Sequence, residues 1–175
     1  FGQPLHAFDA DKIRSGRIEV KKLEAGTAFI TLDDKSRNLH AEDLMICDAE
    51  GGLCLAGVFG GKNSGVTDDT KNIFLESACF SGIGIRKTSF RHGLRTDAAL
   101  RFEKGTDPGL CERVLLRAVQ LITEIAGGEV IGNPTDLYPG KKDKTEITLT
   151  WQYLKKLSGK NYHPEAVRTI LQSLG

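Results

Sequence analysis

Residues 44–58 read LMICDAEGGLCLAGV, and this stretch decides the fold that we expect. Two apolar runs, at residues 44–47 and 53–58, lie on either side of a glycine-containing turn at residues 50–52. Short apolar runs joined by such a turn are typical of a β-hairpin. The stretch therefore predicts two antiparallel strands.

The sequence before and after this hairpin continues the β pattern. We expect further strands at residues 18–23, 27–32 and 73–80, and a second hairpin turn at residues 33–35. These segments are rich in β-branched and aromatic residues and are broken by turn residues. Short strands joined by tight turns favour mostly antiparallel pairing.

After residue 80 the pattern changes from strands to helices. Residues 82–92 and 98–104 predict short helices, and residues 108–126 predict a longer one. The longer segment has apolar residues at helical spacing, a proline in its first turn and two glycines after its last turn. With one more strand at residues 129–138, the fold class is α+β: mixed, mostly antiparallel sheets packed against helices.

A polar, turn-rich segment near residue 140 indicates a boundary between two domains. We expect one domain over residues 1–140 and the incomplete beginning of a second, smaller domain over residues 145–175. The second segment is predicted to contain a strand followed by two helices, at residues 146–150, 151–157 and 164–174. We therefore expect the chain to be a piece of a longer protein.

Composition and charge narrow the possible functions. The 175 residues are 39% hydrophobic and 27% charged, with a formal net charge of +1, as in ordinary globular proteins. No stretch approaches the roughly 18–20 apolar residues of a membrane span. The first 85 residues carry a charge of −4 and the rest +5, with basic residues dense between Arg86 and Lys104. Such a cluster is either a phosphate-binding surface or an ordinary solvated face.

Several familiar site motifs are absent from the sequence. The four cysteines have no metal-ligand spacing, so we expect buried free thiols, Cys79 among them, and no metal site. The glycine-rich residues 56–63 fail the P-loop pattern at both ends. They are either a tight turn or a place where a ligand approaches the backbone closely.

Glu76 is the residue whose position is hardest to explain structurally. It lies inside the apolar run 73–80, and an unpaired buried charge is very costly. By strand alternation Phe74 and Glu76 share one face. Glu76 is therefore either on a solvent-facing side of the strand or a recognition group in a pocket, and the pattern leaves both open.

Several motifs, in order, give the sequence a resemblance to a known family. The chain resembles the editing module of the β subunit of bacterial phenylalanyl-tRNA synthetases over about residues 1–138. The stretches that carry the resemblance are GQPLHAFD (2–9), LAGVFGG (55–61), NIFLESA (72–78), GLRTDA (93–98), RFEKG (101–105) and DP (107–108).

The resemblance implies an activity and a set of site residues. The editing module hydrolyses tyrosine wrongly esterified to the phenylalanine tRNA. The family pattern places catalytic groups at His6, Glu76 and Thr96, and substrate-binding groups at Gly60, Glu76, Thr96 and Ala98. The adjoining basic run implies contacts with the tRNA acceptor end by Arg86, Lys87, Arg91 and Arg95. His6 alone, without a neighbouring nucleophile, is also consistent with a structural histidine.

The chemistry of discrimination agrees with a carboxylate at position 76. A hydrophobic pocket rejects an added hydroxyl only about 10²-fold, so a second site that demands the hydroxyl is useful. A hydrogen bond to a charged group is worth roughly 1.5–3 kcal/mol, which is roughly tenfold to a few hundredfold in selectivity. Gly60 would admit the ligand close to the backbone, and Ala98 would keep the pocket wide enough for an aromatic ring.

The resemblance also implies partners and cofactors. The whole synthetase is a cytoplasmic α₂β₂ heterotetramer that uses ATP and magnesium to charge the tRNA, with its aminoacylation site in the α subunit. We expect no cofactor and no metal within this segment, and no membrane association. Two other functions remain open: a non-catalytic RNA-binding or scaffolding segment, and a sensor of free amino acids.

Overall fold

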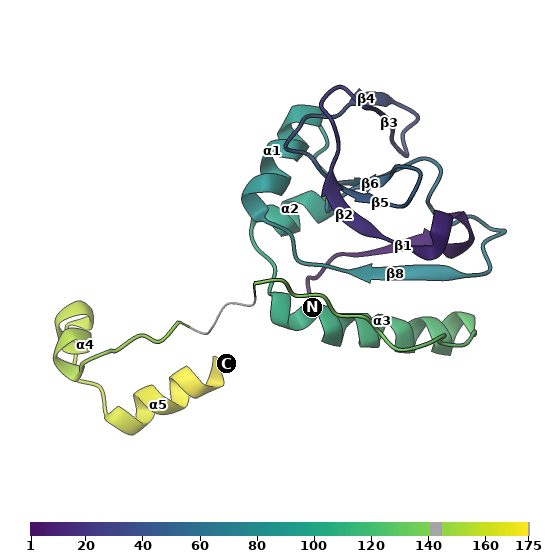
Figure 1. The fold of residues 1–175 in the computed structure, drawn as a ribbon. Coiled ribbons are helices and arrows are strands. Elements are labelled where there is room, and N and C mark those ends of the chain that lie inside the picture. Colours follow the sequence, from purple (N-terminus) through teal and green to yellow (C-terminus); the bar gives the residue numbers. More distant parts are fainter. Residues whose placement is uncertain (141–144, 175) are drawn as a thin grey trace. The chain divides into compact units, whose positions relative to one another are not determined.

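The computed structural model describes residues 1–140 and 145–174 of the chain. The chain divides into two compact units, Phe1–Pro134 and Thr135–Gly175 (Figure 1). The domain boundary near residue 140 stays a prediction, and four residues of the expected linker, 141–144, lie outside the described residues.

Strands of the first unit pair in an antiparallel manner throughout. Three sheets form: β2-β5-β6-β7, β1-β8 and β3-β4. The hairpin predicted around residues 50–52 is confirmed as β5-β6, and the turn at residues 33–35 is confirmed between β3 and β4. The strands are β1 (Leu5–Asp9), β2 (Glu19–Lys22), β3 (Ala28–Ile30), β4 (Ser36–Asn38), β5 (Leu44–Cys47), β6 (Gly52–Leu55), β7 (Phe59–Gly60) and β8 (Ile73–Ser77).

Backbone hydrogen bonds tie the three sheets to one another through the segment 59–65. The amide of Leu32 donates to the carbonyl of Gly60 (3.0 Å), which joins the β3-β4 hairpin to β7. The amide of Asp9 donates to the carbonyl of Ser64 (3.1 Å), which joins β1 to the same segment. The glycine-rich segment therefore lies where the sheets meet.

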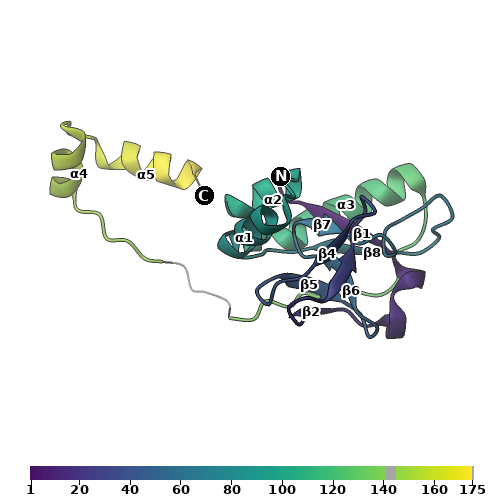
Figure 2. The ribbon, with the colours of Figure 1, turned by 90° about the horizontal axis from the view of Figure 1, so that it is seen from above.

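Three α-helices complete the first unit. They are α1 (Gly82–His92), α2 (Asp97–Glu103) and α3 (Cys111–Ala126). Helices α1 and α2 contact each other at one end of the sheets, and α3 runs along β8 (Figures 1 and 2). Short 3₁₀ turns occupy Ala10–Lys12, Arg14–Gly16 and Pro108–Leu110. The α+β class is confirmed.

The main core lies between α1, α2 and the β5-β6 hairpin. It includes Met45, Leu55, Ile85 and Phe102, all almost fully buried. Gly57 follows β6 with a φ of +66°, and a Cβ there would lie 2.8 Å from Phe80 and 2.9 Å from Phe102. A glycine is required because the backbone turns in the left-handed region directly against the core.

Some details of the sequence interpretation are wrong. Residues 129–138 and 146–150 form no strand, because no neighbouring strand is present among the described residues to take their backbone hydrogen bonds. The helix predicted from residue 108 begins as α3 at Cys111, after the 3₁₀ turn. Cys47 and Cys54 are buried as predicted, whereas Cys79 is exposed because it follows the end of β8.

The second unit contains two amphipathic helices, α4 (Trp151–Ser158) and α5 (Pro164–Ser173). The hydroxyl of Thr150 caps α4 by accepting from the amide of Tyr153 (3.2 Å). Among the described residues, no helix is long and apolar enough to cross a membrane.

Candidate functional site

The β1-β8 pair brings the first two predicted site residues together. His6 lies directly opposite Glu76 in the antiparallel register, and Phe8 lies opposite Phe74. Side chains directly opposite each other share one face of the pair, with Cβ atoms about 5 Å apart. The His6 and Phe8 rings contact edge to face with centroids 4.4 Å apart, which fixes the imidazole against this face.

The carboxyl group of Glu76 lacks the partners that a buried charge normally has. It makes no hydrogen bond or ion pair with any residue that the structure describes. Burial raises its pKa to about 7, and no cation among the described residues opposes that effect. Glu76 is half-buried, so it is not a fully exposed group, and its role in recognition stays a prediction. A carboxyl group held in this way is a candidate for ligand recognition.

The imidazole of His6 also lacks a hydrogen-bond partner. Its Nε2 atom is buried and has no hydrogen-bond partner within residues 1–140 and 145–174. Burial lowers the pKa of His6, so the ring is neutral at pH 7. A neutral imidazole nitrogen offers either a donor or an acceptor, depending on its tautomer.

Gly60 is the third residue of this cluster. It belongs to β7 and is buried, and a Cβ at this position would lie 3.2 Å from Cε1 of His6 and 2.7 Å from Cδ1 of Leu32. The missing side chain therefore lets the His6 ring and the Leu32 side chain pack directly against the backbone of β7. Leu32 was not foreseen as a site residue, since nothing in its local pattern shows that it reaches β7.

Thr96, the residue before α2, and Ala98, in α2, are the remaining predicted substrate-binding residues. The hydroxyl of Thr96 donates to the carbonyl of Val58 (2.7 Å) and accepts from the amide of Ala99 (3.1 Å). Thr96 thus caps α2 and links the start of this helix to Val58, two residues before Gly60. Ala98 is half-buried against the main core. The described contacts give Thr96 a positioning role, and its contact with substrate stays a prediction.

The four basic residues predicted to contact tRNA have different surroundings. The guanidinium of Arg91 bonds to the buried carboxylate of Asp43 and lies 3.6 Å from Glu42. Lys87 lies 3.9 Å from Glu42. Arg86 and Arg95 are exposed and lie over the ring of Phe90. Arg91 is therefore already engaged inside the protein, whereas Arg86 and Arg95 are available at the surface.

Asp43 is the centre of a buried polar network that sequence reasoning missed. Its carboxylate accepts from the Thr88 hydroxyl (2.9 Å) and the His40 amide (2.8 Å), and contacts Nε2 of His92 (2.6 Å). These bonds outweigh the cost of burial and lower the pKa of Asp43. The network holds the end of α1, from which the chain continues to Thr96.

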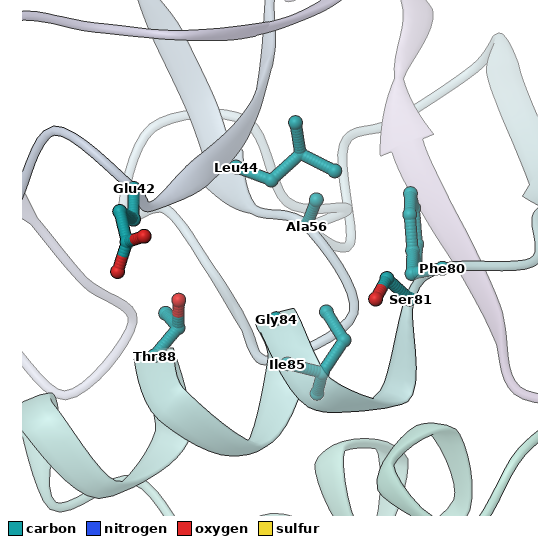
Figure 3. Close-up of a pocket in the computed structure, with 8 residues that line it drawn as sticks. All are labelled: Glu42, Leu44, Ala56, Phe80, Ser81, Gly84, Ile85 and Thr88. Atoms are coloured by element: carbon teal, nitrogen blue, oxygen red, sulfur yellow. The ribbon is translucent and has the colours of Figure 1, made fainter.

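A small pocket lies between α1 and the β5-β6 hairpin (Figure 3). Gly84, Ile85 and Thr88 form one side, and Leu44 and Ala56 face them from the hairpin. Its volume of about 40 Å³ has room for water but not for an aromatic ring. None of the predicted substrate-binding residues lines it. The pocket is a packing gap beside the Asp43 network rather than the site of His6 and Glu76.

The described residues offer no cluster of three or more histidine, cysteine or acidic side chains that could hold a metal ion. The groups that the site offers are the carboxyl group of Glu76 and the neutral imidazole of His6. They lie on one face of the β1-β8 pair, and His6 is next to the backbone of Gly60.

Proteins of several bacteria are similar to this chain over nearly its full length. The chain is 49% identical over 175 residues to the phenylalanine–tRNA ligase beta subunit of Porphyromonas gingivalis, covering 99% of the chain and 21% of that protein. It is 44% identical over 174 residues to the corresponding subunit of Bacteroides fragilis, and 42% identical over 175 residues to that of Carboxydothermus hydrogenoformans. The coverage is 99% and 100% of the chain, and 21% and 22% of those proteins.

The chain thus spans about a fifth of the length of these relatives, and the resemblance seen in the motifs is confirmed. Residues 1–127, which contain every one of the predicted site residues, match the B3/4 domain. This chain belongs to the B3/4 domain family.

Proposed function

We propose that this chain is the editing module of a phenylalanine–tRNA ligase β subunit and hydrolyses tyrosine esterified to the phenylalanine tRNA. The observation that carries the proposal is the carboxyl group of Glu76, half-buried without a hydrogen-bonding partner among the described residues, opposite His6, whose buried Nε2 has no partner there either. Buried polar groups without partners are rare in proteins, and a ligand that supplies the partner explains them.

Tyrosine supplies what Glu76 lacks. Its phenolic O–H donates to the carboxylate, and this bond favours the ionised form over the neutral form that burial favours. A phenylalanyl ester has no hydroxyl and leaves the carboxyl group unsatisfied. The lost bond corresponds to a preference of roughly tenfold or more for the tyrosyl ester over the phenylalanyl ester.

The hydrolysis itself needs one water molecule. The water oxygen adds to the ester carbonyl carbon, the bond from that carbon to the terminal ribose oxygen breaks, and a water proton passes to the departing oxygen. The products are tyrosine and a tRNA with a free terminal hydroxyl. We assign to neutral His6 the positioning of this water through Nε2, and to Gly60 the close approach of the ester to the backbone.

The test is a deacylation assay on Tyr-tRNA(Phe), with Phe-tRNA(Phe) as the substrate that lacks the hydroxyl. The full chain and the complete β subunit with its α subunit are compared, each unaltered, as Glu76→Ala, and as Glu124→Ala at an exposed position of α3. Release of tyrosine that Glu76→Ala reduces at least tenfold, and that Glu124→Ala leaves unchanged, supports the proposal. Intact Tyr-tRNA(Phe) with the complete enzyme contradicts it.

The wider setting of the module is proposed from the names of its relatives. They are β subunits of a tRNA ligase, which supports a tRNA and an α subunit as partners, in an α₂β₂ enzyme of the cytoplasm. ATP and magnesium serve the aminoacylation reaction of that enzyme, and we assign neither to a residue of this chain.

A further inference from the structure

An exposed aromatic ring lies beneath two arginines on the surface of the first unit. Phe90, in α1, is 61% exposed. The guanidinium carbon of Arg86 lies 5.8 Å from the ring centroid, and that of Arg95 lies 5.0 Å from it. Arg86 is one helical turn before Phe90, whereas Arg95 comes from the loop between α1 and α2. The three side chains form one patch, which we call the Phe90 platform.

The platform carries positive charge that its neighbours do not fully neutralise. Arg86 makes no ion pair with a carboxylate in the described part of the chain. Arg95 lies 3.7 Å from Glu103, but its side chain is 48% exposed, so that pair is screened by solvent. Lys87 adds a further exposed ammonium on α1. Phosphate groups are the counter-charge that such a patch lacks.

A ring with guanidinium groups over it matches the chemistry of an unpaired nucleotide. Bases stack on exposed aromatic rings whatever their sequence, and arginine binds phosphate through its planar fork. Cation–π contacts at exposed sites are weak compared with base–aromatic stacking. A base that stacks on Phe90 therefore displaces a weak contact and frees a guanidinium for the adjoining phosphate. An acidic peptide would satisfy the arginines but leave the ring exposed.

The platform lies next to the proposed editing site along the chain. Arg95 is directly followed by Thr96, whose hydroxyl is bound to the carbonyl of Val58 two residues before Gly60. The loop that carries Arg95 is thus fixed to the segment that forms the site.

We propose that the Phe90 platform binds one unpaired nucleotide of the single-stranded end of tRNA, with its base stacked on Phe90 and its phosphate on Arg86 or Arg95. The choice of tRNA rests on the proposed function, whereas the stacking of an unpaired nucleotide does not. The platform is a nucleotide subsite outside the cluster of His6, Gly60 and Glu76.

The test measures binding of a short single-stranded RNA ending in CCA to the full chain, with 2-aminopurine replacing one base at a time. Phe90→Leu keeps apolar volume but removes the ring, and Phe90→Tyr keeps the ring. Phe1→Leu is the matched control, because Phe1 is 70% exposed and has the Arg113 guanidinium 5.5 Å from its ring centroid. Thermal unfolding of each variant checks that it is folded.

The expected result is quenching of 2-aminopurine at one position by the unaltered chain and by Phe90→Tyr. Affinity should fall about tenfold in Phe90→Leu and stay unchanged in Phe1→Leu. Equal affinity of Phe90→Leu and the unaltered chain at the same salt concentration would overturn the proposal. So would equally tight binding of a fully paired RNA, or tighter binding of polyglutamate, which would indicate a protein partner.

The same assay separates this proposal from the editing function. Glu76→Ala should bind the RNA as the unaltered chain does, because Glu76 is not part of the platform. If Tyr-tRNA(Phe) stays intact while Phe90→Leu weakens RNA binding, the results contradict the editing function and support nucleotide binding by the Phe90 platform. If tyrosine is released while Phe90→Leu binds the RNA as the unaltered chain does, the results support the editing function and contradict nucleotide binding by the Phe90 platform.

Discussion

His6 and Glu76 lie directly opposite each other across the β1-β8 pair, and neither Nε2 of His6 nor the Glu76 carboxyl group has a hydrogen-bond partner within the described residues. A buried polar atom without a partner, such as Nε2 of His6, costs the folded state roughly 1–3 kcal/mol. The two side chains lie on one face of the strand pair, and we propose that a ligand supplies their missing partners.

The Glu76 carboxyl group should make stability depend on pH. Burial raises its pKa to about 7 in the folded chain from an ordinary value of 4.5, so the folded chain binds this proton more tightly than the unfolded chain does. The contribution is fully present below pH 4.5 and is lost as pH rises through 7. We compare the free energy of unfolding of Glu76→Gln with that of the unaltered chain at each pH. The difference should favour Glu76→Gln by up to about 3 kcal/mol more at pH 8 than at pH 4.

Chemical denaturation at several pH values measures this difference. Glu124→Gln, at an exposed position, is the control and should show a difference that does not vary with pH. A difference for Glu76→Gln that is equally flat between pH 4 and pH 8 would show that Glu76 is solvated in the folded chain.

Gly60 should matter for activity more than for stability. In Gly60→Ala the new Cβ meets the end of the Leu32 side chain at 2.7 Å and the His6 ring at 3.2 Å. Leu32 is 48% exposed and can move aside, whereas His6 is held against Phe8. We expect a loss of about 1 kcal/mol in unfolding free energy and a loss of deacylation of tenfold or more.

Gly65→Ala is the matched control for Gly60→Ala. Its Cβ would lie 3.6 Å from Leu32, an ordinary contact, and its φ is outside the left-handed region. Deacylation by Gly65→Ala should stay within about twofold of the unaltered chain. If Gly60→Ala deacylates just as well, the ester does not need the bare backbone of Gly60 beside His6.

Local patterns were sufficient to predict most elements of the first unit. The β5-β6 hairpin follows from a glycine-containing turn between two apolar runs, and such signals act over a few residues. Residues 129–138 carry similar apolar residues, but Ile131 and Leu137 are 90% and 84% exposed. A strand needs a neighbour to pair with, and a single segment does not show whether one exists.

The site was predictable only in part for the same reason. Motif resemblance pointed to His6, Gly60 and Glu76, which the structure brings together. The pairing of Asp43 with Arg91, 48 residues further along, follows from no local pattern. The bond from Thr96 to Val58 was equally out of reach, since its acceptor lies 38 residues away.

Arg91 and Arg95 should respond differently to removal of their side chains. Arg91→Ala breaks a charged hydrogen bond to the buried Asp43, so we expect a loss of about 1.5–3 kcal/mol in unfolding free energy. Arg95→Ala removes a solvent-exposed group and should change stability by no more than about 0.5 kcal/mol while weakening RNA binding. Denaturation and RNA titration of both variants measure this. Equal stability of the two would contradict the assignment of Arg91 to the Asp43 network.

Thr96 tests whether a predicted catalytic residue acts by positioning. Thr96→Val keeps the shape of the side chain. It removes the acceptor of the Ala99 amide and the donor to the Val58 carbonyl. We expect a loss of about 1–2 kcal/mol in unfolding free energy and a parallel fall in deacylation, because α2 is no longer fastened next to Gly60. Thr96→Ser, which keeps the hydroxyl, should retain most of both. If Thr96→Val is as stable as the unaltered chain yet inactive, the hydroxyl acts on the substrate directly rather than through Val58.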